Sequence, residues 1–229
     1  MKKYLIGIAF VFISVSVMSQ GVTGGLYISP VISWLKPDSK NITKDGSRFG
    51  FGFGIPVDFN FSKNFAFSTG IAYTNIGGNL KYADSIPKFE TVDSTYHLVP
   101  GTAIKYKTSF IEIPLSLKGK TNEIGYITYF LKAGISPQFR FKAKGDISSI
   151  NPGDNLDIKA EVRSFNMGYH IGGGIEYSLG GSTKLLVEAL FTNGLTNFSK
   201  VETLKKPTDK PKNENTILNS ISLKVGILF

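Results

Sequence analysis

Apolar and polar residues alternate along much of this chain, and the apolar positions exclude charged side chains. Between residues 49 and 61 every odd position is Phe, Ile or Val, whereas the even positions are Gly, Pro, Asp or Asn. Successive side chains of a β-strand point to opposite faces, so a period of two predicts strands with one apolar face. After residue 20 no stretch of sequence keeps the 3.6-residue apolar period of a helix over several turns. The sequence therefore predicts an all-β protein.

Eight segments carry this alternation, although the first is less regular because both of its faces hold apolar residues. Several of them match the roughly 9 to 11 residues that a tilted strand needs to cross a membrane. The predicted strands lie at residues 25–35, 49–61, 65–73, 109–119, 126–141, 164–179, 183–191 and 217–229. Short turns at 62–64, 120–123 and 180–182 alternate with long polar segments at 36–47, 76–105, 142–161 and 196–216.

Charged residues lie on only one face of the seven regular strands. A barrel in a membrane explains this, because aromatic side chains can face lipid while paired charges fill the narrow interior of an eight-stranded barrel. A sheet in lipid must also close, since lipid offers no partner for an unpaired edge. The charges expected to pair in the lumen, together with a histidine on the same face, are Asp58, Glu112, Lys118, Lys132, Arg140, His170, Glu176, Glu188 and Lys224.

We therefore predict an eight-stranded antiparallel transmembrane up-and-down β-barrel. A soluble exported barrel that binds a small apolar ligand, in the manner of lipocalins, is the alternative. The chain has no cysteine, which excludes disulfides, zinc thiolate sites and a lipid-modified N-terminal cysteine.

Residues 1–19 combine two lysines, an apolar run and a small residue, Ser19, at the end. This pattern predicts a cleaved secretory signal peptide, because the apolar run is shorter than the roughly 20 residues of a membrane-spanning helix. Residues 20–229 then form the barrel domain. An even number of strands places both of its ends in the periplasm and the four long segments outside the cell.

The last predicted strand has apolar residues at every second position and ends on an aromatic residue. It resembles the C-terminal strand signal of outer-membrane barrels, which the barrel-insertion machinery reads. The residues of this insertion signal are Ile221, Leu223, Val225, Ile227 and Phe229.

Four further segments resemble one family, the PorT-like outer-membrane β-barrel proteins of Gram-negative bacteria. They are FIEIPLSLK at 110–118, YFLKAGISPQF at 129–139, FNMGYHIGGGIEY at 165–177 and ALFTNGLTNF at 189–198. This chain has Leu190 and Phe191 where the family often has Arg–Tyr, which removes a lumenal base. The resemblance implies an eight-stranded barrel in the outer membrane of a Gram-negative bacterium. The namesake's link to a protein secretion system is not carried by particular residues here.

The glycine-rich stretches at 50–54 and 172–174 lack the following helix that a nucleotide-binding loop requires, so no cofactor is expected. His97 lies in a long segment with Glu90 and Asp93, and a single histidine among scattered acids predicts a solvated loop rather than a metal site. The net charge of +9 suits an anionic surface. Because the chain is exported, we expect outer-membrane lipid or lipopolysaccharide to be that partner, and not nucleic acid.

The sequence thus predicts a non-enzymatic outer-membrane barrel with a side-chain-filled lumen and long extracellular loops for surface recognition, anchoring or support of the envelope or of secretion. A lipid-modifying enzyme, an acyl hydrolase or transferase that uses His170 and Glu176, is the alternative. Catalysis on lipid requires a nucleophile and base on the lipid-facing wall, whereas His170 is on the other face. A protein or glycan partner is expected at loop side chains such as Tyr82, Phe89, Tyr96, Lys200, Lys205 and Lys206.

Overall fold

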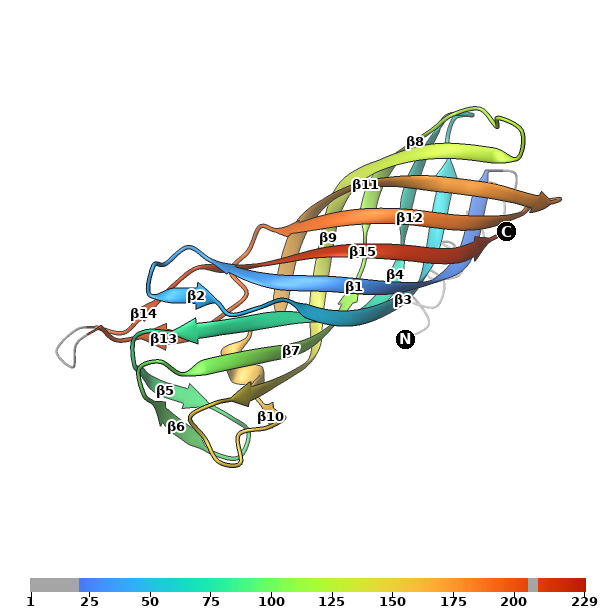
Figure 1. Cartoon of the computed structure of the whole chain (residues 1–229). Helices are drawn as coiled ribbons and strands as arrows, with labels where there is room; N and C mark the ends of the chain where they lie inside the picture. The colour runs from blue at the N-terminus through green and yellow to red at the C-terminus, as the bar shows by residue number, and fades with distance from the viewer. Residues whose placement is uncertain (1–20, 206–209) are drawn as a thin grey trace, which may run out of the picture.

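The computed structural model describes residues 21–205 and 210–229, and its main sheet closes into a barrel (Figure 1). Closure occurs between β1 (Val22–Pro37) and β15 (Thr216–Leu228), which pair antiparallel from Gly25↔Leu228 to Pro37↔Thr216. The predicted signal peptide lies outside the described residues. Among the described residues, no helix is both long and apolar enough to cross a membrane.

The ring has eight antiparallel strands when the two collinear pieces β7 and β8 are counted as one. This confirms the fold predicted from the alternation. All neighbours in the ring pair in sequence order, so the barrel is of the up-and-down type. The strands that complete it are β3 (Arg48–Asn60), β4 (Phe65–Tyr82), β7 (Ala103–Glu112), β8 (Leu115–Lys120), β9 (Ile127–Ile147), β11 (Phe165–Gly180) and β12 (Thr183–Gly194).

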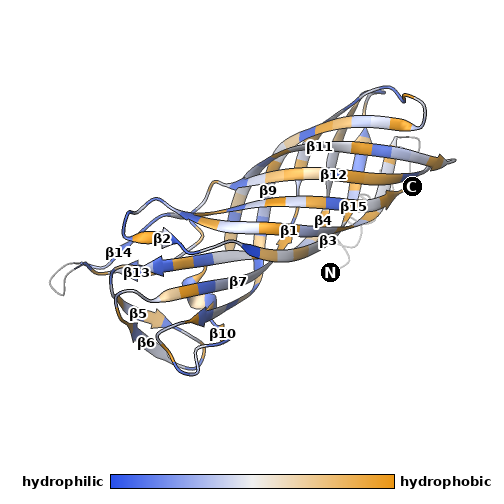
Figure 2. Ribbon diagram, viewed as in Figure 1, coloured by the Kyte–Doolittle hydropathy of each residue, from blue (hydrophilic) through white to orange (hydrophobic). Residues whose placement is uncertain are grey.

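Exposed apolar side chains cover the outer wall of the barrel over the half nearest the last residue of the chain, and apolar residues colour much of the ribbon there (Figure 2). Phe49, at the start of the most regular predicted strand, is 72% exposed, and the alternate positions Phe51, Phe53 and Ile55 are also exposed. The glycines between them face the interior, where Gly54 leaves room for the ring of Tyr27. In water such a surface would be unfavourable, whereas in lipid it is the expected outer face.

The polarity of the strands reverses in the halves that lead to the four long connections. Beyond Tyr73 of β4, the inward positions Ile76 and Leu80 are apolar and buried, whereas Asn79 and Lys81 are on the outer face. In β9 a bulge accompanies the change, so that Phe141 and Lys142 are both exposed. The reversal is physically reasonable because the upper wall faces water on its outside and needs an apolar core inside.

Consequently, two of the predicted loops were too long. The predicted segments 76–105 and 142–161 contain the ends of β4 and β9 and the start of β7, because a strand pattern with reversed faces resembles a polar loop in the sequence. The remaining parts of the long connections form a folded cap, at the opposite end of the barrel from the last residue (Figure 1). Its elements are β2 (Ile42–Lys44), β5 (Ile86–Glu90), β6 (Thr95–Leu98), β10 (Leu156–Asp157), the 3₁₀ turn η1 (Lys159–Glu161), β13 (Glu202–Thr203) and β14 (Lys212–Asn213).

Among the described glycines, Gly70 alone combines a positive φ with a backbone atom close to an added Cβ. Its φ is +149°, and a Cβ there would lie 2.2 Å from the carbonyl oxygen of Ile55 on β3. We expect Gly70→Ala to lower the free energy of unfolding by about 1–3 kcal/mol, measured by urea unfolding in detergent. Gly24→Ala is the control, because nothing lies within 4 Å of its added Cβ. Equal stability of the two variants would contradict the strain argument.

Candidate functional site

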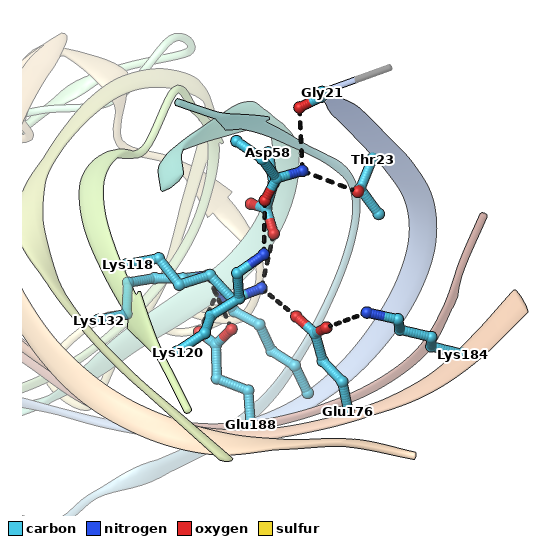
Figure 3. Close-up of polar contacts among 11 residues, drawn as sticks. Gly21, Thr23, Asp58, Lys118, Lys120, Lys132, Glu176, Lys184 and Glu188 are labelled. Atoms are coloured by element: carbon cyan, nitrogen blue, oxygen red, sulfur yellow. Dashed lines mark hydrogen bonds and ion pairs between the residues drawn. The ribbon is translucent and has the colours of Figure 1, made fainter. Parts of the chain in front are cut away.

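A layer of ion pairs fills the lumen between the lipid-facing walls (Figure 3). Its first group centres on Lys118 of β8, whose side chain is 2% exposed. The Nζ of Lys118 lies 2.6 Å from Asp58 of β3 and 2.5 Å from Glu176 of β11. The other carboxylate oxygen of Glu176 accepts from Lys184 of β12 at 3.0 Å. This chain of four charges spans the lumen from β3 to β12.

The second group centres on Glu188 of β12. Its two carboxylate oxygens are 2.8 Å from Lys132 and 3.2 Å from Lys224. Lys224 also lies over the ring of Tyr27, 4.9 Å from the centroid, while Lys118 lies 4.4 Å over Phe130. Because lysine charges inside a barrel have little water around them, these carboxylates and ring faces replace the lost hydration.

Two of the charges expected in the lumen are not in ion pairs. Glu112 instead accepts a hydrogen bond from the amide of Gln138 at 3.0 Å. The guanidinium of Arg140 donates to the backbone carbonyl of Lys159 near the cap. Of the charges expected to pair in the lumen, Glu112 and Arg140 therefore have no ion-pair partner among the described residues. Lys184 was missed, although it shares a face with Glu188 and the alternation alone could have placed it in the lumen.

His170 lies in the lumen between two serines, and its side chain is buried. Its Nε2 is 2.7 Å from Ser116 Oγ, and its Nδ1 is 2.7 Å from Ser136 Oγ. Glu176 is six residues along the same strand, roughly 20 Å away at about 3.3 Å per residue. The histidine and carboxylate of the enzyme hypothesis are therefore not brought together, and the carboxylate is held by lysines.

The space left around this layer is small. A cavity of about 20 Å³ lies beside His170 and Glu188, which is room for about one water molecule. No group of three or more His, Asp or Glu side chains suited to a metal occurs in residues 21–205 and 210–229.

Above the ion pairs, the lumen is closed by an apolar core that the sequence did not predict. Each of the four long connections contributes to it, through Ile42, Phe89, Ile158 and Phe198. Expected partner-binding side chains Tyr82 and Phe89 are buried in this core instead, so they are not available to a partner. The further members on the strands and in the cap are Val31, Leu35, Ile76, Leu80, Ile86, Leu98, Ile104, Tyr106, Phe110, Ala143, Ile147, Val162, Val201 and Leu218.

The cap also contains a buried acid, Glu161 of η1. Its Oε1 accepts a 2.6 Å hydrogen bond from the backbone amide of Glu90, which ties the segment before β11 to β5. Burial raises the pKa of the Glu161 carboxyl above its ordinary value, although the hydrogen bond from Glu90 acts in the opposite direction. A carboxyl whose pKa is higher in the folded state destabilises that state when ionised.

We therefore expect Glu161→Gln to stabilise the cap at neutral pH. The amide side chain of the variant keeps an acceptor for Glu90 without a buried charge. In the wild type, ionisation of Glu161 costs no stability below the pKa that this carboxyl has in the unfolded chain. The cost is complete above its pKa in the folded protein. The difference in stability between the wild type and the variant should therefore vanish in acid. Hydrogen exchange of the Glu90 amide, corrected for its intrinsic pH dependence, measures this. Exposed Glu202 of the same cap provides the control, Glu202→Gln. A variant difference that persists at low pH would contradict the expectation.

Comparison with known proteins gives a family match and several similar structures. The family model of the outer membrane protein beta-barrel domain matches residues 18–200. Among solved structures, the chain is similar to Neisserial surface protein A, with 14% identity, coverage of 88% of this chain and 95% of that chain, and a TM-score of 0.42. It is also similar to Ail, the attachment invasion locus protein of Yersinia pestis, in complex with the heparin analogue sucrose octasulfate, with 16% identity, coverage of 91% and 99%, and a TM-score of 0.44.

A third similar structure is OprG from Pseudomonas aeruginosa, with 12% identity, coverage of 91% and 94%, and a TM-score of 0.41. No curated protein matches the chain. The family match extends over more than half of the residues, and it includes most of the strands that build the lumen. This chain belongs to the outer membrane β-barrel domain family.

Proposed function

We propose that the protein is a non-enzymatic outer-membrane barrel with a sealed lumen, whose folded extracellular cap serves surface recognition, anchoring or support of the envelope or of secretion. The observation that carries this proposal is the double seal inside the barrel. The ion pairs around Lys118 and Glu188 fill one level, and the apolar core around Tyr106 and Phe198 fills the level above. We infer that these two levels together close the lumen to solutes.

The cap is better suited to recognition than four mobile loops would be. Its core joins segments from all four long connections, and Tyr82 and Tyr106 share a 2.7 Å hydrogen bond inside it. A surface that is already ordered loses less conformational entropy when a partner binds. We propose a protein or a glycan as that partner. Lys200 and Lys205 are exposed on the cap and remain available for contact, whereas Lys206 lies outside the described residues.

Planar-bilayer recordings test the sealed lumen. The purified full chain is expected to give no steady conductance. A large, steady open channel would overturn the proposal, because it requires a path past both the ion pairs and the apolar core. A matched recording with a known open porin shows that the bilayers report channels under the same conditions.

The proposal also excludes lipid modification, and this has a separate test. After incubation with lipopolysaccharide, mass spectrometry of the acyl chains is expected to show no change. An altered acyl pattern that disappears in His170→Ala would instead support the enzyme. We consider this outcome less consistent with the geometry, because Ser116 and His170 are both buried in the lumen and face away from lipid.

We further propose that residues 1–19 direct export and are then cleaved, and that the outer row of β15 is read by the insertion machinery. The side chains of Ile221, Ile227 and Phe229 are exposed on the outer wall. Phe229→Ala is expected to reduce the amount of barrel assembled in the outer membrane of cells severalfold, while refolding in detergent stays unchanged. Unimpaired assembly in cells would contradict this reading. Phe67→Ala, another exposed aromatic on the wall, is the control.

A further inference from the structure

Exposed aromatic side chains gather on the outer wall where β9 and β11 approach the extracellular boundary. Phe139 and Phe165 are directly paired across the two strands, and their ring centroids are 5.4 Å apart. Phe141, at the bulge of β9, is also exposed. These three rings end the apolar part of this wall on its extracellular side, because the outer positions beyond them are polar.

Three cations follow immediately above these rings, and we name Lys142, Lys144 and Arg163 the basic patch. Lys142 and Lys144 occupy successive outer positions of β9, roughly 7 Å apart. Arg163 precedes Phe165 by two residues, just before β11 begins, and it is exposed. The adjacent backbones are held together, because the amide of Arg140 donates to the carbonyl of Ser164 at 2.8 Å.

No ion pair within the described part of the chain holds the basic patch, although Lys144 is directly paired across the strands with Asp157 of β10 on one side. Lys144 lies directly opposite Lys107 of β7, which is an unfavourable pairing of like charges. The Nζ of Lys107 donates to the side-chain Oδ1 atoms of Asp146 at 2.6 Å and of Asn155 at 3.0 Å. Among the described residues, no carboxylate lies within ion-pair distance of Lys142, Lys144 or Arg163. An external anion would therefore complement cations that the fold leaves without an ion pair among the described residues.

We propose that this face of the barrel binds a phosphorylated, acylated glycolipid of the outer leaflet. Acyl chains pack on Phe139, Phe141 and Phe165, and phosphate groups contact the basic patch. The order along the strands matches such an amphiphile, because its phosphates lie directly above its chains. The Arg163 guanidinium can bind a phosphate through two parallel hydrogen bonds, whereas the lysines act as point charges.

A glycolipid with two phosphates fits better than a phospholipid with one. The three cations are spread along β9 and the segment before β11, so two phosphates can each contact a different part of the patch. The extracellular location of the face rests on the orientation given under the proposed function. Glycolipid binding concerns the outer wall, so it can fail while the lumen stays sealed and the cap stays folded.

The test compares the full chain with the variant Lys142→Gln/Lys144→Gln/Arg163→Gln, purified in a neutral detergent. Binding is measured by native mass spectrometry with bisphosphorylated lipid A, with lipid A stripped of its phosphates, and with phosphatidylglycerol. We expect the wild type to bind the bisphosphorylated form at least about ten-fold more tightly than the stripped form. The triple variant should lose this preference while keeping its residual binding through the aromatic rings.

The control variant Lys40→Gln/Lys88→Gln/Lys212→Gln removes the same charge from positions in the extracellular segments, and it should retain the preference. Emission of the single tryptophan, Trp34, confirms that each variant is folded. Unchanged affinity of the patch variant for bisphosphorylated lipid A would overturn the proposal. Equal binding of phosphatidylglycerol would also overturn it, since the wall would then attract any anionic lipid.

Discussion

Replacing Lys118 with methionine is expected to lower the free energy of unfolding by about 3–5 kcal/mol, or to prevent folding of the barrel altogether. The reason is that Asp58 and Glu176 would keep their charges in the lumen without the cation that lies within 2.6 Å of each. Urea unfolding of the barrel in detergent measures this, followed by the fluorescence of Trp34 on β1.

A second variant separates the loss of a partner from the loss of lysine itself. Asp58→Leu/Lys118→Met/Glu176→Gln removes all three charges, and the glutamine still offers Lys184 an acceptor. A buried ion pair replaced as a unit by residues of similar size is often neutral or stabilising. We therefore expect this triple variant to recover most of the lost stability. If the single variant unfolds like the wild type, the lysine is not paired as the structure shows.

Phe198→Ala is expected to destabilise the cap by about 3–5 kcal/mol while leaving the lipid-facing part of the barrel intact. Phe198 is 1% exposed and meets the ring of Tyr106 edge-on, with 5.6 Å between centroids. Its removal leaves a cavity at the point where the loop after β12 packs on β7. Hydrogen exchange should then accelerate in β5, β6 and η1, but not in the periplasmic halves of β11 and β12.

Val92→Ala provides the control for the cap, because Val92 is 72% exposed in the turn between β5 and β6 and its loss creates no cavity. Its exchange pattern should match that of the wild type. The Phe198 variant should still give no conductance, since the ion pairs below remain in place. Exchange that accelerates uniformly in cap and barrel would show that the two levels do not unfold separately.

The sequence was sufficient to predict the barrel because every second residue of a membrane-spanning strand faces lipid and must be apolar. Phe51 and Phe53 face outward, and Asp58 faces inward, as the alternation requires. The first strand was irregular for a reason that only the fold shows. Val31 and Leu35 are apolar on the inward face because they belong to the core of the cap, whereas Ile28 and Ile32 face lipid.

The cap could not be predicted in the same way, because its core joins residues that are far apart in the chain. Ile42, Phe89 and Phe198 have no periodic relation to one another, and each is surrounded by polar residues in the sequence. Pairing in the lumen has the same limitation. The alternation places Glu112 and Arg140 on the inward face, but the strand register and the nearby Gln138 decide that neither meets an opposite charge.

The reversal of polarity along β4 and β9 also determines how deep the protein sits in the bilayer. A shift toward the periplasm would draw Lys142 into hydrocarbon, where a lysine on the lipid face costs up to about 2–4 kcal/mol at the midplane. A shift the other way would expose Phe139 and Ile71 to water. The two free-energy costs oppose each other, so they fix the depth of the barrel in the bilayer. The same balance fixes how far the cap stands above the membrane surface.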